Sequence, residues 1–124
     1  KVRNRFFVFK VFHLEEKSSF IVNKRLKKDI WESLYEFPNQ EFFSEKSFLE
    51  EIKKKSIKGY EVSNVVNHFL SHQKIMAVFV HYKKRKFKLR PGEKAIPFEM
   101  IEKYPMPRLI DRYLESFFQK NKAR

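Results

Sequence analysis

The chain has 124 residues, 42% of them hydrophobic and 17% aromatic, enough for one domain (residues 1–124) with a single core. Its formal net charge of +13 favours a polyanionic partner, most often nucleic acid, over a general effect of solubility. The lack of cysteine argues against disulfides, a thiol nucleophile or an iron–sulfur cluster in these residues. The sequence contains no stretch of about 18 apolar residues, so a membrane-spanning helix is not expected. Since residue 1 is Lys rather than Met, we expect a segment of a longer protein.

The first forty residues predict a hairpin followed by a loop. Alternating apolar residues predict strands over residues 5–13 and 19–25, joined by a turn at residues 15–18. Residues 30–37 mix apolar and polar side chains and are followed by Pro38. This pattern predicts a loop that leads into a short strand.

A short helix is predicted next. Ser47 and Glu50 have the spacing of a capping box, with Ser47 at the N-cap, so we expect a helix that ends at about Ser56. Its expected apolar face consists of Phe48, Leu49 and Ile52.

The second half of the chain predicts three more strands and a closing helix. The strands are expected over residues 60–67, 75–82 and 86–89. Pro97 can begin a helical turn, and Pro107 can open the last helix. The inward face of that helix is expected to contain Leu109, Ile110, Tyr113, Leu114, Phe117 and Phe118. Strands, a helix, more strands and a closing helix predict an α+β sandwich.

A polar connection, residues 68–73, separates two of these predicted strands. It contains Ser71 and His72, which we expect at one end of the sheet, where rigid strands can hold them against a ligand. Without a ligand, the same side chains would satisfy backbone groups of the turn.

Together with other segments, this connection resembles the C-terminal domain of the MutY family, the glycosylases that remove adenine mispaired with 8-oxoguanine. The similar segments are Asn-Lys-Arg at 23–25, Ile-Trp-Glu-Ser-Leu-Tyr-Glu-Phe-Pro at 30–38, Leu-Ser-His at 70–72, and residues 104–111. The resemblance covers residues 5–114 approximately. It implies a Nudix-like α/β/α sandwich with a mixed β-sheet and a C-terminal helix.

The resemblance also implies a function. Leu70, Ser71 and His72 would form the lesion-recognition loop, with Ser71 at the oxidised base. Many relatives have Phe at the position of Leu70. The partner would be double-stranded DNA containing 8-oxoguanine opposite adenine. The catalytic carboxylates and an iron–sulfur cluster would lie in an N-terminal catalytic domain of the same chain, so no catalytic or metal-binding residue is expected in these 124 residues. A cytoplasmic, nucleoid-associated protein of bacterial type is expected.

Basic residues are expected to hold the phosphate backbone. The candidates are Lys24, Arg25, Lys83, Lys84, Arg85 and Lys86. Trp31, Tyr35 and Phe37 could stack on bases, but core packing is the expected role of each in so aromatic a chain.

Two other functions are open. A free-standing Nudix hydrolase needs three Glu on one helix, but its motif places only Glu50 and Glu51 correctly, with Lys46, Ser47 and Lys53 at other motif positions. His13, His68, His72 and His81 lack the spacing of a metal site with carboxylates. The third possibility is a nonspecific basic module that binds nucleic acid.

Overall fold

The computed structural model of the chain describes residues 2–122 and has the predicted α+β architecture. In chain order the elements are β1 (Arg3–Leu14), the 3-10 helix η1 (Glu15–Lys17), β2 (Ser19–Lys24), β3 (Tyr35–Glu36), β4 (Asn39–Phe42), α1 (Glu45–Ile57), β5 (Glu61–Val62), β6 (Val66–Leu70), β7 (Gln73–Lys84), β8 (Glu93–Pro97), the 3-10 helix η2 (Phe98–Lys103) and α2 (Arg108–Lys122). The first two strands, the turn between them, the turn after Pro97 and the helix after Pro107 are confirmed.

Two long parallel strands, β1 and β7, form the centre of the sheet. They stay in register from Arg3 opposite Gln73 to Leu14 opposite Lys84. β4 pairs antiparallel with β1, and β5 and β6 pair antiparallel with β7. β2 meets β1 only next to their connecting turn and then pairs with β3 and β8. The predicted mixed sheet is therefore confirmed, and the turn before β7 lies at the same end of the sheet as the start of β1.

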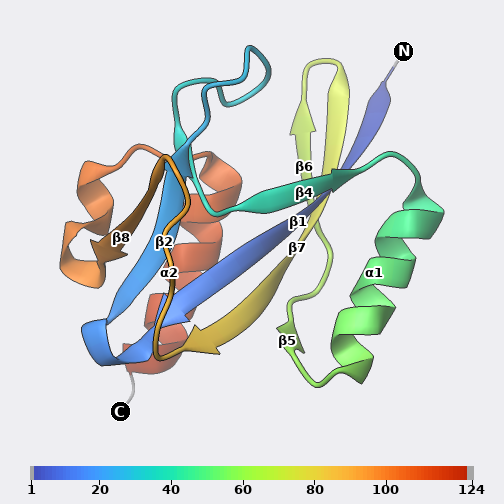
Figure 1. The fold of residues 1–124 in the computed structure, drawn as a ribbon. Coiled ribbons are helices and arrows are strands. Elements are labelled where there is room, and N and C mark those ends of the chain that lie inside the picture. The colour runs from blue at the N-terminus through green and yellow to red at the C-terminus, as the bar shows by residue number, and fades with distance from the viewer. Residues whose placement is uncertain (1, 123–124) are drawn as a thin grey trace.

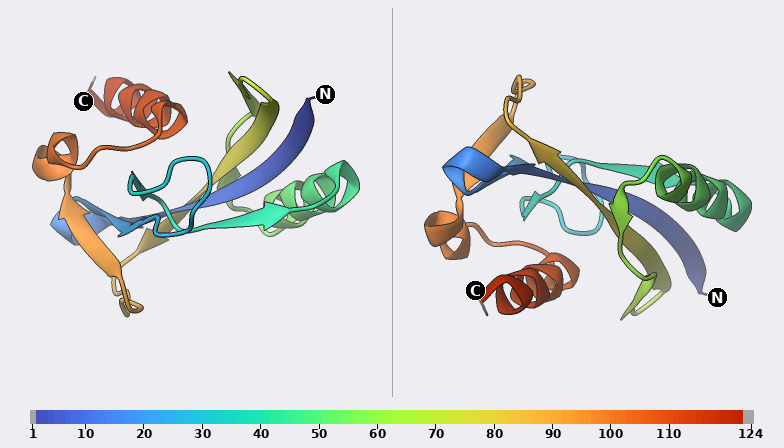
Figure 2. Two further views of the ribbon diagram at one scale, coloured as in Figure 1. Left: turned by 90° about the horizontal axis from the view of Figure 1, so that it is seen from above. Right: turned by 90° about the horizontal axis from the view of Figure 1, so that it is seen from below.

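Helices cover both faces of this sheet (Figures 1 and 2). On the face of α2 and η2, Phe7, Phe9 and Val11 enter the main core. On the face of α1, Phe6 and Val8 enter a smaller cluster. Both sides of β1 are thus buried, which explains its nearly continuous apolar sequence. No helix within residues 2–122 is long and apolar enough to cross a membrane.

Helix α1 begins earlier than predicted. Its N-cap is Ser44, whose hydroxyl oxygen accepts a 3.1 Å hydrogen bond from the Ser47 amide, so Ser47 is a first-turn residue and not the cap. The earlier start adds nearly a turn of backbone hydrogen bonds and places Glu45 where a negative charge favours the helix dipole. Phe48 is buried as expected, whereas Leu49 is 49% exposed and does not belong to the apolar face.

The strand predicted over residues 60–67 is interrupted. The Ser63 amide donates to the Phe79 carbonyl oxygen, and the Phe79 amide donates to the Ser63 hydroxyl oxygen, both at 2.9 Å. The serine side chain therefore replaces a backbone acceptor, and the chain leaves the ladder until Val66.

The strand predicted over residues 86–89 is wrong. This segment is irregular, and its alternation reflects only the packing of Phe87 on Phe12, with ring centroids 4.7 Å apart. The strand that follows is instead β8, which pairs with β2. Because only Ile96 of β8 is fully buried, its sequence lacks the alternation of a half-buried strand.

Candidate functional site

The turn between β6 and β7 consists of Ser71 and His72 and lies at one end of the sheet (Figure 1). Leu70 pairs with Gln73 directly across it. Both turn residues are exposed, and the Arg3 amide donates a 3.0 Å hydrogen bond to the His72 carbonyl oxygen. Two paired strands and β1 therefore hold a serine hydroxyl and an imidazole toward solvent at the predicted place.

Two half-buried residues of β6 that precede this turn, His68 and Leu70, lie on the face of the sheet toward α2. Leu70 packs against the main core, so only Ser71 and His72 of the predicted recognition loop extend from the protein. His68 is half-buried, and burial lowers its pKa, with further lowering by the positive charges of Arg112 and Arg108. The imidazole of His68 is therefore held neutral beside the first turns of α2.

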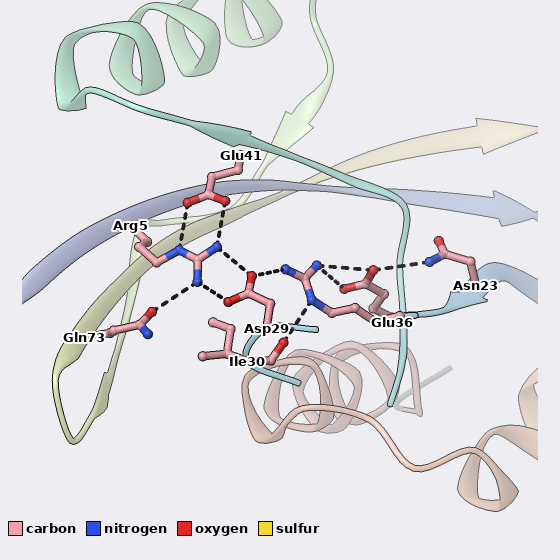
Figure 3. A network of polar contacts seen from close by, with 8 residues as sticks. Arg5, Asn23, Asp29, Ile30, Glu36, Glu41 and Gln73 are labelled. Carbon is pink, nitrogen blue, oxygen red and sulfur yellow. Dashed lines mark hydrogen bonds and ion pairs between the residues drawn. The ribbon is translucent and has the colours of Figure 1, made fainter. Parts of the chain in front are cut away.

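A buried arginine connects the hairpin of β6 and β7 to the other elements at this end of the sheet (Figure 3). Arg5 of β1 is only 3% exposed. Its Nε and Nη2 each donate to Glu41 at 2.8 Å, and its Nη1 and Nη2 donate to Asp29 at 2.9 and 2.8 Å. Nη1 also donates to Gln73 Oε1 at 3.2 Å. One guanidinium thus joins β4, the first residue of β7 after the turn, and the loop that carries Asp29.

A second arginine extends the network. Arg25 Nη2 donates to Asp29 Oδ2 at 2.9 Å and Nη1 donates to Glu36 at 3.2 Å, while Asn23 donates to the other oxygen of Glu36 (Figure 3). The hydrogen bond from Arg5 holds the pKa of Asp29 well below its usual range, although burial opposes it. Burial, the largest influence on Glu36, raises the pKa of that carboxyl. The arginines therefore stabilise the charge of Asp29, whereas at Glu36 burial outweighs the pairing with Arg25.

Arg25 is not available for the DNA-backbone contact predicted for it. Its side chain is 9% exposed and is paired with Asp29 and Glu36. The sequence pattern of neighbouring cations could not show this, because both partners lie several residues further along the chain.

The loop of residues 25–34, which we call the 25–34 loop, is held rigidly and projects at the same end as the hairpin (Figure 1). Trp31 and Ser33 adopt positive φ angles of 62° and 70°, an unusual conformation for a bulky residue. The Trp31 ring packs on Phe7 at a centroid distance of 5.6 Å. This packing and the arginine network fix the strained loop, and they leave Lys27 and Lys28 exposed.

The other basic candidates are exposed but lie at different places. Lys24 lies at the end of β2, next to the 25–34 loop. Lys83 and Lys84 end β7, whereas the Ser71–His72 turn precedes β7. At about 3.3 Å per residue, the two ends of this strand are roughly 36 Å apart. The basic run, residues 83–86, is therefore distant from the turn, whereas Lys74 is next to it.

Helix α1 carries the two carboxylates that match the hydrolase motif. Glu51 faces Lys55 at 3.6 Å and Lys54 at 4.0 Å, and Glu50 is exposed. Within residues 2–122, no three His, Cys, Asp or Glu side chains converge on a point where a metal ion could bind. Trp31, Tyr35 and Phe37 pack in or against the main core, as expected.

An imidazole pair lies at the opposite end of the sheet. His13 Nδ1 and His81 Nε2 are 3.1 Å apart, and the His81 Nδ1 atom is 3.8 Å from Glu61. Burial lowers the pKa of both histidines, although Glu15 and Glu61 partly oppose this. Both rings are thus held neutral in the folded protein.

This pair predicts acid sensitivity. Below about pH 6.5 the unfolded chain binds protons at these histidines before the folded protein does, so stability falls as the pH decreases. We expect His81→Phe to reduce the fall in melting temperature between about pH 7 and 5. His72→Phe, at the exposed turn, is the matched control. If both variants keep the full pH dependence of the wild type, the buried pair does not control it.

A model of the NUDIX domain family matches residues 10–116. The chain belongs to the NUDIX domain family. Among solved structures similar to this Nudix domain, the MutT protein from Methanosarcina mazei Go1 has a TM-score of 0.70 at 15% identity, with 98% of both chains covered. The NUDIX domain of Shewanella oneidensis NrtR, solved with ADP-ribose, has a TM-score of 0.65 at 9% identity, covering 97% of this chain and 88% of that one.

The C-terminal domain of mouse MUTYH, solved with human PCNA, is also similar to this Nudix domain. Its TM-score is 0.64 at 12% identity, with 98% of this chain and 91% of that chain covered. No curated protein matches the chain. These likenesses establish the Nudix fold, which the sequence predicts, but the side chains of this Nudix domain must indicate its function.

Proposed function

We propose that this Nudix domain is the lesion-recognition domain of a MutY-type adenine DNA glycosylase and recognises 8-oxoguanine opposite adenine. The observation that carries the proposal is the Ser71–His72 turn, exposed on a rigid hairpin next to Lys74 and at the same end of the sheet as the 25–34 loop. The net charge of +13 and the fold shared with the MUTYH domain support it. The proposal assigns the catalytic carboxylates and an iron–sulfur cluster to an N-terminal domain, and the whole protein to the nucleoid.

The Ser71 hydroxyl suits the chemistry of the lesion. Guanine presents two acceptors, N7 and O6, in the major groove. In 8-oxoguanine, N7 carries a hydrogen and C8 carries an oxygen, so a donor lies beside a new acceptor. A serine hydroxyl can both donate and accept, and it can therefore match this altered edge. His72 would support the turn or contact the DNA backbone.

Binding to two duplexes that differ only at the lesion tests the proposal. We expect the 124-residue chain to bind a duplex with adenine opposite 8-oxoguanine at least about fivefold more tightly than one with adenine opposite guanine. The dissociation constants are measured by fluorescence anisotropy at one salt concentration, because salt alone changes affinity. Equal affinity for both duplexes and for other polyanions would instead support the nonspecific basic module.

The position of the cations predicts how binding depends on salt. Each phosphate contact contributes a slope of about −0.9 in log affinity against log salt concentration. We therefore expect replacement of Lys27, Lys28 and Lys74 by Ser to flatten the slope by about 2.7 on any duplex that contains the lesion. The comparison of this variant with the wild type needs only a titration series at several salt concentrations.

The basic run serves as the matched control. Replacement of Lys83, Lys84, Arg85 and Lys86 by Ser should not change the slope for a lesion-centred duplex of about 12 base pairs, which extends only about 20 Å to each side. It should flatten the slope for a duplex of about 30 base pairs that follows β7. An unchanged slope on the longer duplex would show that residues 83–86 form a solvated turn.

A nucleotide hydrolase is the second candidate, favoured by the match to the family and by the similarity to a MutT protein. The pairing of Glu51 with Lys54 and Lys55 opposes it, because adjacent cations weaken a site for a divalent ion. We expect no release of phosphate or pyrophosphate from nucleoside triphosphates with magnesium or manganese. Turnover that Glu50→Gln abolishes would contradict the recognition function.

A further inference from the structure

Phe69 is an exposed aromatic residue next to the proposed recognition turn. All 15 Phe lie within residues 2–122, and among them only Phe43 and Phe69 are exposed, with 70% of the Phe69 surface open. In β6 the half-buried residues alternate with exposed ones, so Leu70 packs into the main core while Phe69 lies on the opposite face of the strand. The hairpin that carries it extends beyond both helices (Figures 1 and 2).

The partner of this ring is a lysine. Phe69 lies directly opposite Lys74 in the hairpin, and the Lys74 Nζ atom is 5.6 Å from the ring centroid. The neighbouring cross-strand pair, Asn67 and Met76, lies at the edge of the cluster under α1, so the apolar layer of this face ends there. An open ring with an ammonium group beside it combines a stacking surface with a phosphate contact, the two features of proteins that bind bases.

The spacing along the strand relates this pair to Ser71. Phe69 precedes Ser71 by two residues, or roughly 6.6 Å of extended chain. Successive bases of one DNA strand are about 3.4 Å apart, so the ring is placed about two steps from the base that Ser71 would contact. A protein partner would need further exposed apolar side chains around the ring, whereas Lys74 and the exposed Asn67 border it here.

We propose that Phe69 inserts between two base pairs one or two positions from the lesion and stacks on the base that this exposes, while Lys74 binds the adjacent phosphate. This inference rests on the proposed function, and it differs from the role of Leu70 that the MutY resemblance implies. Stacking does not depend on the identity of the base, so Phe69 contributes affinity rather than lesion preference. Ser71 supplies the preference.

The test uses the 124-residue chain and duplexes with adenine opposite 8-oxoguanine or guanine, each with 2-aminopurine two nucleotides from that site. Phe69→Ala should weaken binding to both duplexes by on the order of tenfold and abolish the change in 2-aminopurine emission. Phe69→Trp should retain both. Phe43→Ala, which removes the other exposed ring, should bind within about twofold of wild type.

The outcomes separate the two proposals. If Phe69→Ala binds like the wild type while Ser71→Ala loses lesion preference, the stacking role is wrong and the proposed function stands. An equal loss in Phe43→Ala would overturn the inference by showing a general effect of exposed rings. If the wild type binds neither duplex, both proposals are wrong.

Discussion

Replacing Arg5 by Met is expected to lower the free energy of unfolding by about 3–5 kcal/mol. The Arg5 side chain is only 4% exposed, and its guanidinium pairs with both Asp29 and Glu41. Without it, two carboxylates that are largely removed from solvent lose their main counterion, and a buried charge without a partner is costly. Urea denaturation monitored by circular dichroism measures the change. Because Arg5 also bonds Gln73, the hairpin should become more mobile in the same variant.

An exposed ion pair provides the control for this expectation. Lys120 lies 3.6 Å from Glu61, and both side chains are more than 60% exposed. Lys120→Met should therefore change stability by less than about 1 kcal/mol. A loss of stability in Arg5→Met no larger than that in Lys120→Met would show that the buried network is not a principal constraint on this end of the sheet.

Ser71→Ala is expected to cost about 1–3 kcal/mol of discrimination between the two duplexes, the usual value of one good base contact. The loss should fall on adenine opposite 8-oxoguanine and not on adenine opposite guanine, because ordinary guanine has no hydrogen on N7. In the intact glycosylase that the proposed function implies, single-turnover adenine release should show the same selective loss. Ser71 is exposed, so the variant should fold like the wild type.

Two variants check the specificity of that result. Ser56→Ala removes an exposed hydroxyl from α1 and should leave both affinities unchanged. His72→Ala changes a residue of the turn as well as a proposed contact, so its melting temperature is measured in parallel. A ratio of affinities that stays constant in Ser71→Ala and His72→Ala would assign the turn a structural role only.

Local patterns were sufficient to predict most of the fold. A nearly continuous apolar run indicates β1, and a proline followed by periodic apolar residues indicates α2. Local patterns failed where tertiary contacts decide the outcome. Ser63 interrupts a strand because its hydroxyl bonds a backbone amide 16 residues away, and β8 forms because β2 offers an open edge.

The candidate site could likewise be predicted from the sequence only in part. The Ser71–His72 turn is predictable because two apolar runs flank a short polar segment. The arginine network is not, because Arg5 is followed by an apolar run and its partners Asp29, Glu41 and Gln73 are 24 to 68 residues away. The exposure of Phe69 depends on which face of β6 meets α2, and the half-buried partner on that face, Leu70, is equally apolar in sequence.

Mapping the DNA contact residue by residue tests the central claim most directly. Nitrogen-15 amide spectra of the chain are recorded with duplexes that contain adenine opposite 8-oxoguanine or opposite guanine. We expect the largest differences between the two complexes at residues 69–74, with smaller ones in the 25–34 loop. Differences centred instead on α1 around Glu50 and Glu51, or confined to residues 83–86, would contradict recognition of the lesion by the Ser71–His72 turn.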